Sequence, residues 1–501
     1  MPEIIISTLN ARYIHASLGA RYLLANMGEL EDVTEIQEFI INTRPIDIAE
    51  KLLASKPKII GLGVYIWNTI ETTELVGLLK SISPETIIVL GGPEVSYETE
   101  QQQITQYADY VITGQADHAF SQLCAQLLSG PRPLNKIINA VAPKLSELKL
   151  PYDVLTQEDI DNRVIYVEAS RGCPFKCEFC LSSLDKTATP FDQELFIEAL
   201  QKLYDRGVRS FKFVDRTFNL KIDNSIRILD FFLDKSDDEL FLHFELIPDH
   251  LPEKLKEKIK LFPDGCLQFE IGIQSFDEGV QKTISRKQNN IKSEENIRWL
   301  VNETTTHLHT DLIVGLPGES LSTFATGFDK LISMNPHEIQ VGILKRLRGT
   351  PVIRHTDGYQ MQYNPIAPYN VLQTDQVSFV EMQKMSRFAR YWDLIANSGR
   401  FKNTLPTILA KSPFKNFMQL SDTLFTMTDQ THRIALNRLF TLLFDVLSNQ
   451  FNINEAELIP VLQKDYERSG LKGTPEFMKP SEPRGKKSKS KSHSKRQNRH
   501  L

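Results

Sequence analysis

The stretch VIYVEASRGCPFKCEFC, residues 164–180, decides how the middle of the chain folds. Its β-branched first half predicts a buried strand, and Cys173, Cys177 and Cys180 follow that strand in one short loop. Three thiolates this close predict iron–sulfur or zinc ligation, and the glycine and proline beside them let the loop fold around a ligand. The C-x3-C-x2-C spacing leaves one coordination position open. We therefore expect a [4Fe–4S] cluster with one iron free to bind a substrate or cofactor.

The other cysteines, Cys124 and Cys266, are distant in sequence. This disfavours a closed zinc site, which needs four ligands, while three unrelated buried cysteines are the remaining alternative. Five cysteines in 501 residues are too few for a disulfide framework. Residues 1–7 (MPEIIIS) lack the features of a secretory signal, and no apolar run reaches the roughly 18 residues of a membrane span. A reducing, cytoplasmic protein is expected, and transporters and membrane receptors are excluded.

Five further strand patterns follow residues 164–170, with helix-length segments between them. They are FKFVD (211–215), LHFELI (242–247), LQFEIGI (267–273), HTDLIVG (309–315) and EIQVGIL (338–344). Six βα units are fewer than the eight of a TIM barrel, so they predict an incomplete (βα)6 barrel over residues 161–350. Ligands are expected at the carboxyl ends of its strands.

Five shorter βα units precede this barrel in residues 1–130. Their strands are EIIISTL, VTEIQEFI, KIIGLGVY, TIIVLGG and DYVITG, each followed by a helical pattern. This order predicts a flavodoxin-like, doubly wound parallel sheet. Residues 131–160 contain four prolines and are interpreted as a linker.

The chain after the barrel changes character twice. Residues 351–472 are predicted to form a small helical domain, and residues 473–501, rich in Lys and Ser, to be disordered. The formal net charge is −5, but residues 481–501 carry eight Lys or Arg against one Glu, which leaves −12 on the first 480 residues. An acidic body disfavours wide contact with nucleic acid, except through this basic tail.

At the three cysteines the chain resembles the radical S-adenosylmethionine (SAM) superfamily. Its signature is C-x3-C-x-aromatic-C after the first strand of a partial (βα)6 barrel, and Phe179 occupies the aromatic position. The resemblance implies that SAM chelates the open iron through its amino and carboxylate groups. Electron transfer from the reduced cluster would then cleave SAM to a 5′-deoxyadenosyl radical that abstracts hydrogen. An electron donor such as flavodoxin or ferredoxin is implied as a partner.

Other segments resemble the branch that includes oxygen-independent coproporphyrinogen oxidases and cobalamin-dependent enzymes. In GIQSFDEGVQKTISR (272–286), the resemblance implies that Gln274 hydrogen-bonds the SAM ribose and that Arg286 pairs with the SAM carboxylate. Glu245 in FELIPD is the candidate partner of a ribose hydroxyl or of the methionine amine. The superfamily often has a Gly-Gly-Glu contact for that amine on the second strand, where this chain has FVDRTFN, so Asp215 is the candidate substitute.

DLIVGLPGES (311–320) resembles the motif of the fifth strand. By this resemblance Asp311 lies near the ribose, and Gly315 lets the backbone approach the adenine. LKRLRGTPV (344–352) resembles the segment that closes the barrel in a bacterial subgroup with an uncharacterised carboxy-terminal helical region. The cationic side chains of this segment are Lys345, Arg346 and Arg348. They either bind an anionic substrate or, as is more usual for surface charges, form a solvated face.

The first domain resembles the cobalamin-binding domain of B12-dependent radical SAM proteins. The matching segments are YIHASLG (13–19), GLGVYIWN (61–68), LGGPEVS (90–96) and ITGQAD (112–117), all at strand ends. The candidate contacts are Tyr13, Gly63, Gly91, Gly92 and Gly114. The Asp-x-His-x-x-Gly motif of a cobalt-ligating histidine is absent, and His15 is expected to form a local hydrogen bond. Cobalamin is therefore expected with neither its own base nor a histidine on cobalt.

These features leave three functions open. The first is a cobalamin-dependent radical SAM enzyme that methylates an unactivated carbon of a small molecule, and the second is a cyclase or rearrangement enzyme with the same cofactors. The third is a non-catalytic nucleic-acid-binding protein with a structural cluster. A methylthiotransferase acting on RNA is disfavoured, because that family needs three more cysteines in its first domain and this domain has only Cys124.

Overall fold

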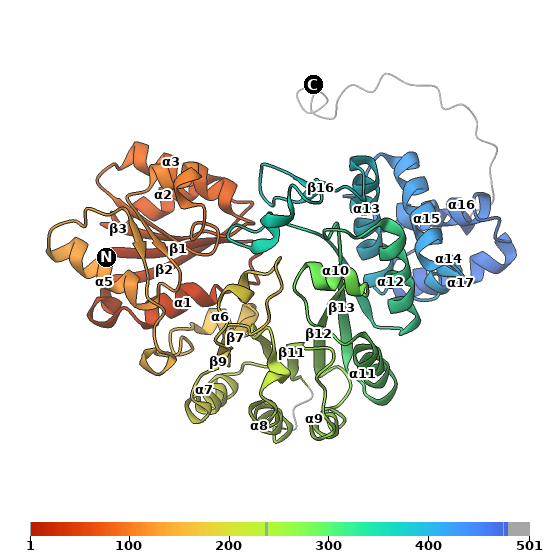
Figure 1. Ribbon diagram of the computed structural model, residues 1–501, viewed down its shortest axis with the longest axis horizontal. Coiled ribbons are helices and arrows are strands. Elements are labelled where there is room, and N and C mark those ends of the chain that lie inside the picture. Colours follow the sequence, from red (N-terminus) through yellow and green to blue (C-terminus); the bar gives the residue numbers. More distant parts are fainter. Residues whose placement is uncertain (1, 236–238, 474, 479–501) are drawn as a thin grey trace.

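The computed structural model describes residues 2–235, 239–473 and 475–478. An amino-terminal α/β domain, a partial barrel and a carboxy-terminal helical region follow one another along the long axis of the molecule (Figure 1). None of the helices in this described part of the chain is both long enough and apolar enough to cross a bilayer.

The first domain is a parallel sheet in the order β2-β1-β3-β4-β5-β6. Its strands are β1 (Ile4–Asn10), β2 (Thr34–Ile40), β3 (Ile59–Gly63), β4 (Ile87–Gly91), β5 (Tyr110–Thr113) and β6 (Ile137–Asn139). Its helices are α1 (Leu18–Ala25), α2 (Pro45–Leu53), α3 (Thr69–Ile82), α4 (Gln103–Tyr107) and α5 (Asp117–Ser129). Helices α2, α3 and α4 pack on one face, and α1 and α5 on the other, each with its own apolar core. The predicted doubly wound sheet is confirmed.

Residues 131–160 are more ordered than a linker. They supply β6, which pairs with β5 as a sixth strand, so the first sheet extends past residue 130. Tyr152 and Leu155 are buried in the barrel core, and α6 (Gln157–Asn162) leads into the first barrel strand. The prediction of a linker was wrong because prolines at the ends of short strands and helices do not prevent these elements from forming.

The second sheet has six parallel strands in the order β14-β13-β12-β11-β10-β7, as the (βα)6 prediction requires. These strands are β7 (Ile165–Val167), β10 (Ser210–Phe213), β11 (Phe241–Leu246), β12 (Leu267–Gln274), β13 (His307–Val314) and β14 (Glu338–Ile343). The helices outside them are α7 (Gln193–Asp205), α8 (Ile222–Leu233), α9 (Glu253–Ile259), α10 (Glu278–Thr283), α11 (Asn290–Glu303) and α12 (Leu321–Ser333). Alternation along β12 buries Phe269 and Ile271 under the helices, so Glu270 and Gln274 face the lumen.

The carboxy-terminal helices pack directly on the barrel and share its core. They are α13 (Phe379–Trp392), a π-helical turn (Asp393–Asn397), α14 (Leu405–Leu409), α15 (Pro413–Thr428), α16 (Leu436–Asn449) and α17 (Glu455–Arg468). The side chain of Asn397 hydrogen-bonds both the N–H and the C=O of Ile339, at 3.1 and 3.0 Å, on the free edge of β14. An open barrel exposes unpaired edge groups, and this side chain pairs two of them.

Two boundaries of the helical region differ from the prediction. Residues 351–378 are mostly non-helical, with a short 3-10 turn η6 (Pro351–His355) and an antiparallel pair, β15 (Gln362–Tyr363) and β16 (Val371–Gln373). At the other end, the predicted disorder from Gly473 is wrong for residues 475–478, because Phe477 stacks on Phe444 with ring centroids 5.2 Å apart. The remainder of the predicted tail, from residue 479, lies outside the described residues.

The segment after β14 joins the barrel to the first domain. Arg346 Nη1 lies 2.7 Å from Glu98 Oε1, and Arg348 Nε lies 2.9 Å from Glu94 Oε1. Tyr369 Oη donates a further hydrogen bond of 2.6 Å to Glu94. Neither interpretation of these arginines was right, because their charges are neutralised between domains rather than offered to a substrate or to solvent.

Candidate active site

A cavity of about 240 Å³ opens at the carboxyl ends of the barrel strands. It brings together most of the predicted barrel residues: Cys173, Cys177, Phe179, Cys180, Glu245, Gln274, Arg286 and Asp311. The cysteine loop, strands β11, β12 and β13, and the turn after α10 supply them, because parallel strands place their carboxyl ends at one rim.

The three thiols lie around this cavity rather than at one point. Among the described residues, no three His, Cys, Asp or Glu side chains converge closely enough to hold a single metal ion. A cubane binds each thiolate on a different iron, so it needs sulfurs that are spread around a space. Burial raises the pKa of Cys173, and it raises the pKa of Cys177 against the opposing charge of Arg286. The donor set fits a [4Fe–4S] cluster, whose positive irons would favour the thiolates.

The remaining two cysteines are in different surroundings. Cys124 packs in the core between the first sheet and α5, and Cys266 packs in the barrel core. Burial raises the pKa of Cys124 to about 12 and that of Cys266 to about 11. Both are apolar core residues, as thiols without a partner usually are.

Glu178, inside the cysteine loop, is a functional candidate that the sequence analysis missed. It is 2% exposed, and its carboxylate accepts a 2.5 Å hydrogen bond from Ser285 Oγ. The same carboxylate pairs with Arg354 and lies 2.8 Å from His355 Nε2, both in η6. The backbone N–H of Glu178 donates to Ile284 O at 3.1 Å. Glu178 therefore fixes the cysteine loop to the turn after α10 and to η6.

Arg286, at the end of that turn, is already committed to protein groups. Its Nε donates to Gln288 Oε1 at 3.0 Å, its Nη2 donates to the carbonyl of Gly272, and its Nη1 lies 3.6 Å from Cys177 Sγ. The predicted residue thus lies at the cavity, but it faces the cysteine loop and the backbone of β12.

Gln274 has a conformation and an unmet hydrogen bond that point to a ligand. Its φ is +69°, uncommon for a residue other than glycine, and it follows a register shift in β12 after Gly272. Its side-chain Oε1 is buried and has no hydrogen-bond partner among the described residues. Because a buried acceptor without a partner is costly, this oxygen suits a ligand hydroxyl.

Carboxylates in the lumen have environments that differ strongly. Burial raises the pKa of Glu245 to about 7, against the opposing charge of Arg216. Burial also raises the pKa of Asp311, although His309 opposes it from 3.3 Å. Burial disfavours a charge on His309, but hydrogen bonds to Asp311 and Glu338 raise its pKa to about 10. The lumen can therefore hold groups of either charge.

Two predicted residues lie outside this cavity. Asp215 is buried and accepts hydrogen bonds from the N–H of Ala169 at 2.9 Å and from Ser170 Oγ at 2.6 Å, so it braces the start of the cysteine loop. At Gly315, a Cβ would lie 2.5 Å from a side-chain carbon of Val371. This glycine, with φ +86°, lets the β16 region pack closely rather than admitting a ligand.

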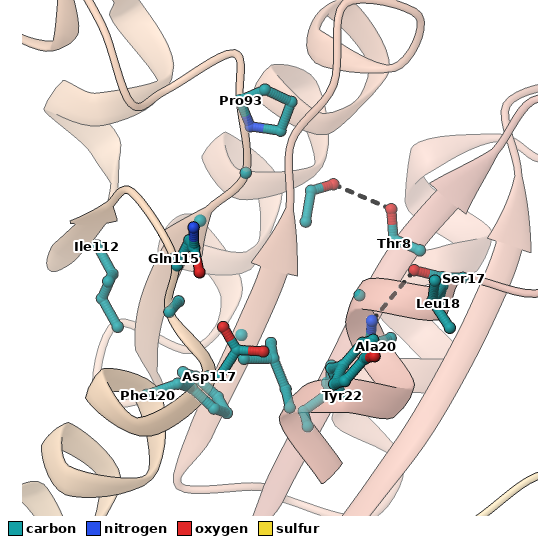
Figure 2. Close-up of a pocket in the computed structure, with 18 of the residues that line it drawn as sticks. Thr8, Ser17, Leu18, Ala20, Tyr22, Pro93, Ile112, Gln115, Asp117 and Phe120 are labelled. Atoms are coloured by element: carbon teal, nitrogen blue, oxygen red, sulfur yellow. Dashed lines mark hydrogen bonds between the residues drawn. The ribbon is translucent and has the colours of Figure 1, made fainter. Parts of the chain in front are cut away.

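A second cavity, of about 540 Å³, lies in the first domain between the sheet and helices α1 and α5 (Figure 2). Small residues that lie side by side on neighbouring strands form its floor, since Thr8 of β1 pairs with Gly63 of β3 and Gly63 pairs with Gly91 of β4. A Cβ on Gly91 would meet no atom nearer than Ile112 O, at 3.9 Å. Removing side chains from the α1–α5 face of the sheet therefore leaves a slot that a large, flat ligand can enter.

The predicted glycines line this cavity, and the aromatic residue does not. Gly63, Gly91, Gly92 and Gly114 are all in its wall. Tyr13 is 49% exposed and donates a 2.9 Å hydrogen bond to Glu158 elsewhere. His15 forms a hydrogen bond, but its partner is not local as predicted, because Nδ1 lies 2.7 Å from Oη of Tyr166, 151 positions along the chain. No histidine of the described chain lines the cavity.

The cysteine loop forms a wall of both cavities. Arg171, just before Cys173, makes two 3.0 Å contacts with the carboxylate of Asp117 at the start of α5. Farther along the loop is a 3-10 turn, η4 (Leu181–Leu184), in which Ser182 lines the first-domain cavity and Ser183 lines the barrel cavity. Neighbouring residues of this one loop therefore line both cavities.

Three protein-family models match the chain. The model described as the radical SAM superfamily matches residues 167–331, and the B12 binding domain matches residues 4–124. A model described as a protein of unknown function (DUF4080) matches residues 357–501. The first two matches fall on the regions that contain the two cavities.

Individual relatives are distant. An uncharacterised methyltransferase of Pyrococcus horikoshii is 28% identical over 240 residues, which are 42% of this chain and 52% of that protein. The cobalamin-dependent radical SAM methyltransferase TokK of Streptomyces tokunonensis is 23% identical over 346 residues, which are 62% of this chain and 50% of that protein. The chain spans about half the length of these curated relatives.

A solved structure covers more of the molecule. The radical SAM methyltransferase TsrM of Kitasatospora setae, in a structure with tryptophan and a SAM analogue bound, superposes with a TM-score of 0.59 at 13% identity. The superposition covers 85% of this chain and 95% of that one. At this identity the likeness shows a shared fold.

Proposed function

The chain is a radical SAM protein with a B12-binding domain, and we propose that it is a cobalamin-dependent methyltransferase acting on an unactivated carbon of a small molecule. When bound, SAM on a reduced [4Fe–4S] cluster supplies a 5′-deoxyadenosyl radical that abstracts hydrogen, and cobalamin supplies the methyl group. A reduced flavodoxin or ferredoxin in the cytoplasm is the electron donor of this proposal.

One observation carries the proposal: a single loop forms a wall of both cavities. The loop contributes all three thiols to the barrel cavity and contributes Arg171, Gly172, Ser182 and Asp185 to the first-domain cavity. Hydrogen abstraction and methyl transfer must act on the same carbon, so the SAM site and the cobalamin site must lie close to each other. The shared loop supplies this arrangement, and the names of the relatives favour methyl transfer over cyclisation or rearrangement.

The residues of the chain have separable tasks in this proposal. Cys173, Cys177 and Cys180 would hold the cluster, and Gln274 Oε1 would accept a hydrogen bond from a SAM hydroxyl. Glu178 keeps the cysteine loop in place while SAM and substrate exchange. In the first domain, the glycine row would accommodate cobalamin without a histidine on cobalt.

The test uses the full chain, purified and reconstituted without oxygen. It should contain about four irons and retain hydroxocobalamin after desalting. With a reductant it should convert SAM slowly to 5′-deoxyadenosine, and with the correct substrate it should also form S-adenosylhomocysteine and a methylated product. Stoichiometric zinc with little iron would refute the cluster, while 5′-deoxyadenosine formation with a substrate that is never methylated would favour the cyclase alternative.

A further inference from the structure

The cysteine loop has an outer face that borders a third cavity, of about 940 Å³. In η4, Ser183 lines the barrel cavity, whereas Leu181 and Leu184 line this third one. Leu181 directly follows Cys180, one of the expected cluster ligands. Gln115 lines both the third cavity and the first-domain cavity, and none of the described residues lines both the third cavity and the barrel cavity. This cavity, named the outer groove, therefore borders both proposed cofactor sites from outside the barrel.

The outer groove is open to solvent and partly apolar. Leu145 and Leu195 line it, and Leu195 is 61% exposed. Val141, between the lining residues Ala140 and Ala142, is 89% exposed. Single exposed apolar side chains are normal, but several around one hollow mark a surface that binds a partner.

Residues 140–150 supply one wall of the groove, and the segment that contains them, 131–150, is cationic. This segment has a net charge of +3, whereas the first 480 residues sum to −12. Its cations are Arg132, Lys136, Lys144 and Lys149. Lys144 lines the groove with its side chain 82% exposed, and its Nζ lies 3.5 Å from the one carboxylate of the segment, that of Glu147. Exposed pairs of this kind are weak, so Lys144 can exchange Glu147 for a carboxylate of a partner.

Two further carboxylates line the groove, and both are engaged within the chain. Asp185 accepts hydrogen bonds from the N–H and the Oγ of Thr187, at 3.0 and 2.7 Å. Asp192 accepts one of 3.1 Å from the N–H of Leu195, in the first turn of α7. The lysines of the cationic segment are left to attract an acidic partner, whose approach they steer although the rest of the body is acidic.

The proposed reaction needs one electron at each cofactor. Methylation balances as R–H + 2 SAM⁺ + 2 e⁻ → R–CH₃ + 5′-deoxyadenosine + methionine + S-adenosylhomocysteine. The first electron breaks the S–C5′ bond of one SAM, and the second returns cobalamin to the oxidation state that accepts the methyl group of the other. The substrate carbon has to enter the barrel cavity, with which the groove shares no described residue. An electron has to reach only the cluster and the corrin, and the groove lies against the walls of both sites.

We propose that the outer groove is the docking surface of an acidic flavodoxin, which supplies both electrons in successive encounters. A flavodoxin exposes the apolar edge of its flavin in a negatively charged surface, and this edge matches an apolar groove beside a cationic segment. In each encounter the reduced flavin loses one electron and the protein dissociates, as the small interfaces of electron-transfer complexes allow. This inference rests on the proposed function, because it takes the cluster and cobalamin as the electron acceptors.

The experiment compares a protein reductant with a small one on the reconstituted full chain. The double variant Val141→Asp/Lys144→Glu changes two mostly exposed side chains, so it should fold as wild type does. The matched control is Val380→Asp/Lys411→Glu, which makes the same changes at exposed positions of the helical region. Binding of oxidised flavodoxin is measured by isothermal titration calorimetry. SAM cleavage and cobalamin reduction are then measured with flavodoxin, reduced by its reductase and NADPH, and separately with dithionite.

In the double variant the dissociation constant for flavodoxin should rise about 10-fold or more, and flavodoxin should reduce both cofactors more slowly by a similar factor. Dithionite should give wild-type rates, and the control should match wild type throughout. Unchanged flavodoxin binding, slower reduction of only one cofactor, or an equal loss with dithionite would overturn the inference. A wild-type dimer that the variant dissociates would do the same, because a second copy would then be the occupant. Wild type that cleaves SAM with dithionite but binds no flavodoxin overturns this inference alone, whereas no cleavage with either reductant overturns the proposed function.

Discussion

Replacing Gly91 by isoleucine should block the first-domain cavity without disturbing the sheet around it. Gly91 ends β4, its φ is not positive, and an added Cβ meets nothing nearer than 3.9 Å. A β-branched side chain is well tolerated at a strand end. Gly92 is a poorer choice, because its φ is +105° and a Cβ would lie 2.5 Å from Val64 O, which confounds ligand exclusion with backbone strain.

The size of the effect follows from the cavity. Isoleucine adds four carbons, each with about the volume of one water, or about 30 Å³, so it removes about 120 Å³. That is close to a quarter of the 540 Å³ between the sheet and helices α1 and α5. Forcing a bound molecule to shift by this amount costs about 1–3 kcal/mol, which corresponds to about 5- to 150-fold in the dissociation constant.

The assay is an anaerobic titration with hydroxocobalamin, followed by desalting and measurement of the retained cobalt. Gly358→Ile is the control, because Gly358 lies in an exposed turn with no atom within 4 Å of its added Cβ. Iron content and the circular dichroism spectrum should match wild type in both variants, since the first domain has its own core. Gly91→Ile that retains as much cobalamin as wild type would refute the assignment of this cavity.

Four other predictions follow from the same structure. Cys177→Ala should abolish iron uptake, whereas Cys124→Ala should leave it unchanged, as measured by iron and sulfide analysis; iron loss in both would indicate general misfolding. Glu178→Gln keeps the shape of the side chain but loses the charge that pairs with Arg354 and His355 of η6. The variant should retain the cluster, and the EPR signal of the cluster with SAM should broaden; a wild-type spectrum would argue against a positioning role. Burial raises the pKa of Glu319 to about 8, so the folded state binds this proton more tightly than the unfolded state does, and stability is lost as the pH rises from about 4.5 to 8. Glu319→Gln should remove this loss, which amounts to about 3 kcal/mol between pH 5.5 and 8.5, in urea unfolding compared at those two pH values; parallel curves for the two proteins would contradict it. Deleting residues 481–501 should change neither iron content nor SAM cleavage, because the segment has almost no apolar residue to bury; a truncated chain without iron would show otherwise.

Local sequence was sufficient for the order of the elements. The period of the apolar residues separates strands from helices, and the alternation of the two restricts the topology to parallel sheets. The spacing of Cys173, Cys177 and Cys180 is equally local, because a loop of this length keeps the three thiols together in any compact fold. Boundaries were less certain, as the sixth strand β6 and the contact of Phe477 show, because packing decides whether a short segment is ordered.

The tertiary structure decided which polar side chains serve the site. Glu178 meets His355, Arg216 meets Glu245, and Arg348 meets Glu94, pairs separated by 177, 29 and 254 positions in the chain. No local pattern reports such pairs, because they form only when the barrel brings strand ends to one rim and the first domain docks beside it. Asp215 and Gly315 lie outside the cavity for the same reason. A residue at a strand end can face either the ligand or a neighbouring loop, and the sequence does not distinguish the two.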